Sequence, residues 1–145
     1  MNKKILTLLV ILAITVGALS VVSAADTHEV NGVKFNIPDG YTYDQKINEM
    51  AYKEWDSHSP DSMAVFSNGG SDELIYIFVE DNMKNQTLKD MISDYDQYPE
   101  KTINGKTGIY NDNADGKQSF AYLDGKKAIV IIAPDESVME QCIVK

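Results

Sequence analysis

The segment Asn111–Gly116 carries the strongest local pattern of ligand-type side chains in this sequence. Asn111, Asn113 and Asp115 place oxygen atoms at alternate positions and a glycine follows them, which is how a calcium loop begins, because the glycine allows the oxygens to converge on one cation. The segment then departs from that pattern, since its first residue is not Asp and its twelfth is Tyr122 in place of a bidentate Glu. We therefore favour a hairpin turn built from turn-forming residues. Calcium binding at millimolar affinity is the alternative.

Four aromatic side chains, Tyr41, Tyr43, Tyr52 and Trp55, gather within fifteen residues. Aromatic rings with neighbouring Asp and Asn suit sugars or peptides, because a ring stacks on an apolar face while acids and amides take hydroxyls or backbone donors. Packing in the core is the favoured alternative. If a binding groove exists, this region is where we expect it, with Tyr76 and Phe78 on its floor.

Asn85 begins an Asn-Gln-Thr triplet, which is the acceptor pattern for N-glycosylation in an exported chain. We expect it to be exposed at the start of a helix. Asn85 or Thr87 is also expected to cap that helix, and both roles are compatible.

Residues suited to catalysis are scarce. His28 and His58 are the only histidines and are expected to be solvated, and the lone Cys142 is expected to be a small buried hydrophobe. There is no Gly-x-Ser-x-Gly motif. With 22 carboxylates, some pair lies at a glycosidase-like separation by chance, so a carboxylate-dependent hydrolase is only a remote alternative. We expect no enzyme, and no cofactor beyond weakly bound Ca²⁺.

The amino-terminal stretch has the features of a signal peptide. Lys3 and Lys4 precede the uncharged run Ile5–Val22, and small residues lead up to Ala24. We predict cleavage after Ala24, with residues 1–24 as the signal peptide and residues 25–145 as a single secreted α+β domain. The alternative is a retained anchor, since the run is near the lower limit for spanning a bilayer. In both cases the domain is expected outside the cytoplasm, secreted or attached to the cell envelope.

The charge balance limits the classes of partner that the protein is expected to bind. The chain has 13 Lys and Arg against 22 Asp and Glu, a net charge of −9, and all 13 of the basic residues are Lys. Such a surface repels phosphate backbones and anionic lipid headgroups, so we expect no nucleic acid, and a membrane only through the N-terminal segment. Cations and basic protein surfaces are the partners that this charge favours.

Apolar periodicity and turn residues predict the elements. Segments 28–30 and 33–37 flank Asn-Gly and form a hairpin, residues 62–67 and 73–80 are strands, and residues 102–134 form strands joined by Asn-Gly and Asp-Gly turns. Glu73–Glu80 and Ala128–Ile132 are apolar on both faces, so both strands are expected to lie centrally in the sheet. Residues 41–55 are predicted as a loop followed by a strand.

Two helices are expected on the sheet. Leu88, Met91, Ile92 and Tyr95 follow helical spacing in 87–98, and Asp135 is a candidate cap for a shorter helix over 135–142. The predicted fold is therefore α+β: an antiparallel sheet of about six or seven strands with one amphipathic helix (87–98) and a short C-terminal helix (135–142).

The order of elements and the phrase Phe35–Tyr41 resemble the start of PsbP-type domains, and Ile103–Gly108 followed by strands and a terminal helix is similar to their later part. The chain also resembles small uncharacterised exported proteins of archaea. The resemblance implies a sheet with helices on both sides and an accessory, assembly or binding role. No site residue can be transferred from it.

The sequence thus favours a non-catalytic binding module outside the membrane, with a protein or glycan partner. The alternatives are a calcium-binding module using Asn111, Asn113 and Asp115, and the remote hydrolase. The sequence does not indicate the ligand or the oligomeric state.

Overall fold

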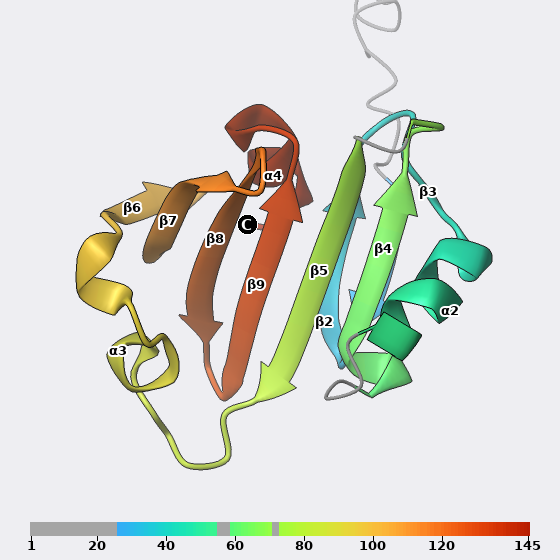
Figure 1. Ribbon diagram of the computed structural model, residues 1–145. Coiled ribbons are helices and arrows are strands. Elements are labelled where there is room, and N and C mark those ends of the chain that lie inside the picture. Colours follow the sequence, from blue (N-terminus) through green and yellow to red (C-terminus); the bar gives the residue numbers. More distant parts are fainter. Residues whose placement is uncertain (1–25, 55–58, 71–72) are drawn as a thin grey trace, which may run out of the picture.

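The structure, a computed structural model, describes residues 26–54, 59–70 and 73–145. The predicted leader, Trp55 and His58 lie outside the described residues. A large antiparallel sheet, a separate hairpin and short helices make up the fold (Figure 1). The predicted α+β class is confirmed.

The large sheet has seven strands in the order β3-β4-β5-β9-β8-β7-β6. Its strands are β3 (Thr42–Tyr43), β4 (Met63–Ser67), β5 (Leu74–Asp81), β6 (Glu100–Ile103), β7 (Lys106–Ala114), β8 (Lys117–Asp124) and β9 (Lys127–Ala133). All neighbouring pairs are antiparallel. β5 and β9 lie next to each other in the middle, as their two apolar faces predicted.

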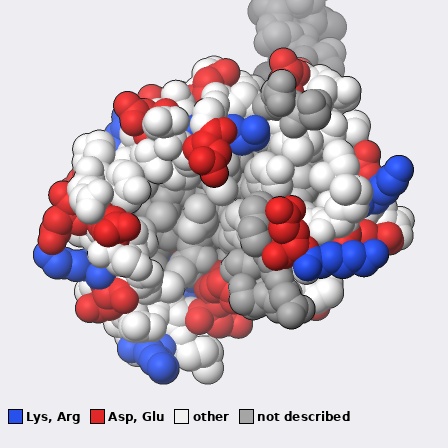
Figure 2. Space-filling view, in the orientation of Figure 1, with Lys and Arg blue, Asp and Glu red and all other residues white. Residues whose placement is uncertain are grey.

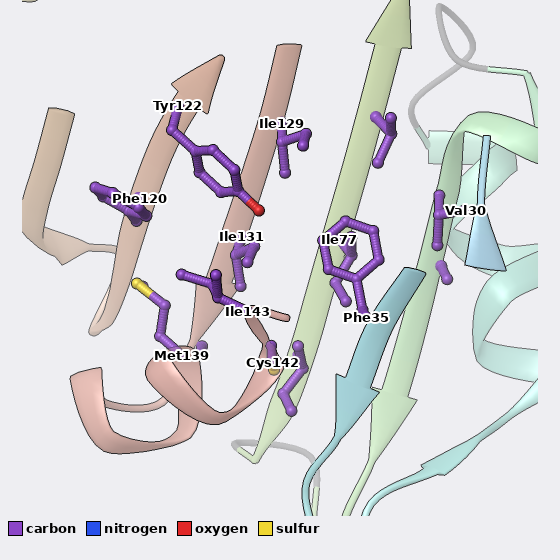
Figure 3. Packing of buried hydrophobic residues seen from close by; sticks show 14 of the residues in the cluster. Val30, Phe35, Ile77, Phe120, Tyr122, Ile129, Ile131, Met139, Cys142 and Ile143 are labelled. Atoms are coloured by element: carbon purple, nitrogen blue, oxygen red, sulfur yellow. The ribbon is translucent and has the colours of Figure 1, made fainter. Parts of the chain in front are cut away.

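One face of the sheet is covered by the hairpin of β1 (Asp26–Val30) and β2 (Val33–Ile37) and by helix α4 (Glu136–Cys142). Figure 3 shows Phe35 from β2 and Met139 from α4 directed at Ile77, Phe120 and Ile131 of the sheet. All five side chains are fully buried. This face therefore holds the main hydrophobic core.

Polar contacts attach the hairpin and the C-terminus to the sheet. Asn31 has φ 44° at the predicted Asn-Gly turn, and its side-chain amide donates to the Val79 carbonyl at 3.0 Å. Phe35 pairs with Ile143 in an isolated bridge, and the Asn104 amide donates to the Ile143 carbonyl at 2.7 Å. The predicted C-terminal helix is present, with the Asp135 carboxylate accepting from the Val138 amide at its start.

The other face is partly covered by helix α2 (Gln45–Glu54), which packs Ala51 against Met63 and Val65. The predicted loop and strand over 41–55 are therefore wrong, apart from the two residues of β3. The helix forms because Asp44 accepts from the Ile47 amide at 3.0 Å and thereby caps its first turn.

The predicted helix over 87–98 is also wrong in length. Helix α3 is only Leu88–Met91, and a 3₁₀ turn, η2 (Tyr95–Gln97), follows after an extended Ile92. The break falls at Ile92, Ser93 and Asp94, where a β-branched residue and two side chains that compete for backbone hydrogen bonds disfavour the helix. A helix of this length also gains little from propensity alone.

Candidate functional site

An apolar groove lies on the second face of the sheet, between α3 and the middle strands. Its volume is about 400 Å³. The groove is lined by Phe78, Glu80, Leu88, Met91, Ile92, Ala121, Ala128, Ile129, Val130 and Ile132. Figure 2 shows this face, where uncharged side chains occupy a hollow in the middle and acidic side chains stand around it.

Strand alternation builds the floor of the groove. In β9, Ile129 and Ile131 are fully buried in the main core, whereas Val130 and Ile132 point to the opposite face and are only half-buried. Ala121 of β8 comes from the same face as Val130, with which it pairs directly. Because alanine is small, this part of the floor is low, and the hollow remains unfilled by the described side chains.

The wall of the groove is α3, whose position is fixed by hydrogen bonds. Thr87 and Asp90 form a reciprocal capping box, in which the Thr87 backbone amide donates to the Asp90 carboxylate at 2.8 Å. The preceding loop is organised by the buried Asn82, whose amide group exchanges two hydrogen bonds with the Gln86 backbone at 2.7 and 2.8 Å. Leu88, Met91 and Ile92 consequently face the sheet. The predicted apolar stripe therefore has the right direction although the helix is short.

Exposed methionines lie on and beside this wall. Met91 lines the groove and is 40% exposed, and Met83, in the loop before α3, is 81% exposed. Methionine side chains are flexible and polarizable, so they adapt to apolar partners of different shape. Their exposure is unusual for a residue type that is mostly buried.

The charges near the groove are acidic. Glu80 is the charged residue among the described lining residues. Glu54, at the end of α2, lies close enough to Tyr76 to add to the effect of burial, and together they raise the pKa of the Tyr76 hydroxyl. Two lysines near the groove are paired, Lys127 with Asp81 at 2.7 Å and Lys89 with Asp96 at 3.0 Å.

The described members of the predicted aromatic set, Tyr41, Tyr43 and Tyr52, do not form one platform. Tyr41 packs against the main core. Tyr52 packs in the α2 cluster on the other face, and its hydroxyl contacts the carbonyl oxygens of Pro60 and, at 2.9 Å, of Met63. Burial, and then the neighbouring Tyr43, raise the pKa of Tyr52 to about 12. Trp55 lies outside the described residues, and a binding role for the four stays a prediction.

Tyr43 is the exposed one among the described members of that set, at 45%. It borders a polar cleft of about 620 Å³ together with Asn31 and Asp61. His28 stacks on its ring, with centroids 5.1 Å apart and an interplanar angle of 13°, and meets Phe66 edge-on. The expectation of a solvated His28 is therefore wrong: it is half-buried, and burial lowers the pKa of its imidazole.

The segment Asn111–Gly116 forms the turn of the β7–β8 hairpin. Asp115 and Gly116 both have positive φ, 53° and 79°, as a two-residue type I′ turn requires. The Asn111 side-chain oxygen accepts from the Asn113 backbone amide at 3.0 Å within an irregular part of β7. Within residues 26–54, 59–70 and 73–145, no group of three or more His, Cys, Asp or Glu could hold a metal ion. Calcium binding through Asn111, Asn113 and Asp115 stays a prediction.

Two further predicted residues can be placed. Asn85 is exposed, with φ 49°, two residues before the Thr87 cap, so glycosylation there also stays a prediction. Cys142 is fully buried and its thiol donates to the Val138 carbonyl. Burial raises its pKa to about 12, as expected for an inert core thiol.

Comparison of the chain with protein-family models, with curated proteins and with solved structures found no match. The resemblance to PsbP-type domains therefore stays a prediction. Among the described residues, no helix has the length and apolar character needed to cross a membrane.

Sequence reasoning missed the groove as a site. It did place Phe78 on the floor of a possible groove, but it assigned that groove to the aromatic residues of 41–55 and treated β9 and the stripe of Leu88, Met91 and Ile92 as core. The available signal was an excess of apolar sheet surface. Two adjacent strands with apolar side chains on both faces need more cover than one short amphipathic segment supplies.

Proposed function

We propose that this protein is a non-catalytic binding module that works outside the cytoplasmic membrane and holds an apolar segment of a partner protein in the groove. The extracytoplasmic part rests on the predicted signal peptide. The binding part rests on one observation, the apolar hollow of about 400 Å³ between α3 and strands β5, β9 and β8.

The size and lining of the groove support this function. Ligand sites are typically concave, mostly apolar and of roughly 300–1,000 Å³, and the groove lies within that range. Burying a leucine-sized side chain there would contribute roughly 1.5–3 kcal/mol, which is partly offset by the freedom that both partners lose on association.

A groove-filling variant tests the proposal. Ala121→Phe places a large ring on the low part of the floor without changing charge. We expect the wild-type protein to bind the neutral apolar dye Nile red with a blue-shifted, enhanced emission, and Ala121→Phe to weaken that binding at least tenfold. Circular dichroism and a thermal melt would establish that the variant is folded.

Methionine variants supply a matched pair. Met91→Ser changes a side chain that lines the groove, whereas Met50→Ser changes one on α2 that is 61% exposed and does not line it. We expect only Met91→Ser to weaken dye binding. Equal dye binding by the wild type and a folded Ala121→Phe variant would overturn the proposal.

A glycan is the second candidate ligand, at the polar cleft beside Tyr43. It is favoured by the exposure of Tyr43 and by the polar groups of Asn31 and Asp61 in the same cleft. One ring face of Tyr43 is already occupied by His28, which leaves only the other for stacking on a sugar. The groove is therefore the better supported site.

A further inference from the structure

We infer that the segment held in the groove is a cationic amphipathic helix, with an apolar stripe that enters the groove and Lys or Arg side chains that meet the acids around it. This inference rests on the proposed function, and names the chemical class of its partner.

The strands on the floor of the groove limit the secondary structure that the partner can have. β5, β9 and β8 are each paired with strands on both sides, so their backbone groups are used within the sheet. A partner cannot add to them as an extra strand and has to be recognised through side chains. An amphipathic helix presents apolar side chains at i, i+3, i+4 and i+7 along one stripe, which is how helices are bound in open apolar grooves.

The charges around the groove indicate that the partner carries positive charge. The whole chain carries a net charge of −9. Glu80 lies in the groove itself, and Glu54 reaches the same face beside Tyr76. The flanking Lys89 and Lys127 are each held by an aspartate. In Figure 2, red side chains border the hollow, whereas most of the blue ones lie toward the outline of the molecule. An anionic partner would be repelled and a cationic one attracted.

The exposed methionines fit such a partner. Met91 forms part of the wall, and Met83 stands beside it in the loop before α3. Flexible thioether side chains next to acidic groups suit amphipathic cationic helices of varied sequence, because the methionines repack while the charges set orientation.

The test uses two synthetic peptides of 18 residues as probes. Both carry leucine at i, i+3, i+4 and i+7, with lysine at the other positions in the first peptide and glutamate in the second. Titration calorimetry with the whole protein would give the affinities. We expect the Leu/Lys peptide to bind one to one, and at least tenfold more tightly than the Leu/Glu peptide. The affinity of the Leu/Lys peptide should fall when NaCl rises from about 0.05 M to about 0.5 M, because salt screens the charges.

Two variants separate groove binding from general charge attraction. Ala121→Phe keeps every charge and should abolish binding of the Leu/Lys peptide. The double variant Glu54→Gln/Glu80→Gln should weaken it about fivefold, in keeping with partly exposed ion pairs. The control Glu29→Gln/Glu140→Gln removes the same charge from the hairpin and α4, on the opposite side of the sheet, and should leave the affinity unchanged.

Each outcome is decisive. Equal binding of both peptides, or equal effects of the two double variants, would overturn the inference about charge. If neither peptide binds while Nile red still binds in the groove, the partner class is wrong and the proposed function stands. If the dye also fails to bind, the proposed function itself is wrong.

Discussion

At the scale of single residues, Asn48 shows how a polar side chain can hold two elements together. It is 1% exposed on α2, and its amide exchanges two hydrogen bonds with the Val65 backbone of β4, at 2.8 and 2.9 Å. It also donates to the Asp44 carbonyl at 2.8 Å. β3 pairs only with Phe66 and Ser67 of β4. Asn48 therefore supplies hydrogen-bond partners for backbone groups along the rest of that edge of β4. This buried amide therefore adds polar contacts to the apolar packing that holds α2 on the sheet.

We expect Asn48→Asp to destabilise the protein by about 3 kcal/mol, because it removes the donors of two buried hydrogen bonds and buries a carboxyl group. The measurement is urea unfolding followed by circular dichroism. Asn85→Asp makes the same chemical change at an exposed position with a backbone conformation that Asp tolerates, and should alter stability by less than about 0.5 kcal/mol. Similar losses for both variants would contradict this role of Asn48.

His28 predicts a pH dependence of stability. Burial lowers its pKa in the folded state, so the unfolded chain binds the proton more tightly. The unfolding free energy should therefore fall as pH drops through about 6.5, the ordinary histidine pKa, and level off below the folded-state pKa. His28→Phe keeps an aromatic ring on Tyr43 and removes this dependence.

The experiment compares urea unfolding of the wild type and His28→Phe from about pH 7.5 to pH 4.5, a range that spans the ordinary histidine pKa. Asp81 and Asp90 have lowered pKa values and lose their contributions at more acidic pH, in both proteins alike. Parallel stability curves across the histidine range would show that the His28 stack does not resist protonation.

At the scale of elements, much of the fold could be predicted because turns and central strands carry strong local signals. The Asn31-Gly32 and Asp115-Gly116 pairs mark hairpins through their tolerance of positive φ, and both hairpins are present. β5 and β9 were placed centrally for the right reason. Helix α4 was recognised from its cap, Asp135.

Two elements were predicted wrongly, and the reasons differ: α2 depends on a tertiary contact, whereas the helix expected over 87–98 breaks at residues that locally disfavour it. Helix α2 depends on the buried Asn48. Asparagine is disfavoured in helix interiors, and the hydrogen-bond partner of Asn48, Val65, is distant in sequence. In 87–98 the apolar side chains do follow helical spacing, but Ile92 is extended and the helix ends before it. The apolar stripe therefore lines the groove from one short helix and the residue that follows it. The groove depends on how these two elements leave the sheet face uncovered, which no single segment encodes.

The β7–β8 turn gives a prediction about calcium. Turn geometry accounts for Asp115 and Gly116, and the Asn111 oxygen already accepts a hydrogen bond. We therefore expect the melting temperature to be the same in EDTA and in millimolar CaCl₂. A cation at one hundred times its dissociation constant would add about 2.7 kcal/mol, or on the order of 10 °C. A rise of that size, lost in Asn111→Ala, would establish the calcium alternative.

At the scale of the whole molecule, the two faces of the sheet differ. One face is closed by the hairpin, α4 and the C-terminal residues, whose fully buried side chains form the main core. The other is covered by α2 at one side and α3 at the other (Figure 1). The groove lies between α3 and the middle strands. The larger hydrophobic core thus lies on one face, and the proposed binding groove lies on the other.

The most direct test of the groove as the binding site is methyl NMR of the protein with labelled Met, Ile and Val during titration with the Leu/Lys peptide. We expect the Met91, Val130 and Ile132 methyl signals to shift, while those of Met50, exposed on α2, and Met139, in the main core, do not. Shifts confined to Val30 and Met63 at the Tyr43 cleft, or signals that stay unchanged throughout, would contradict it.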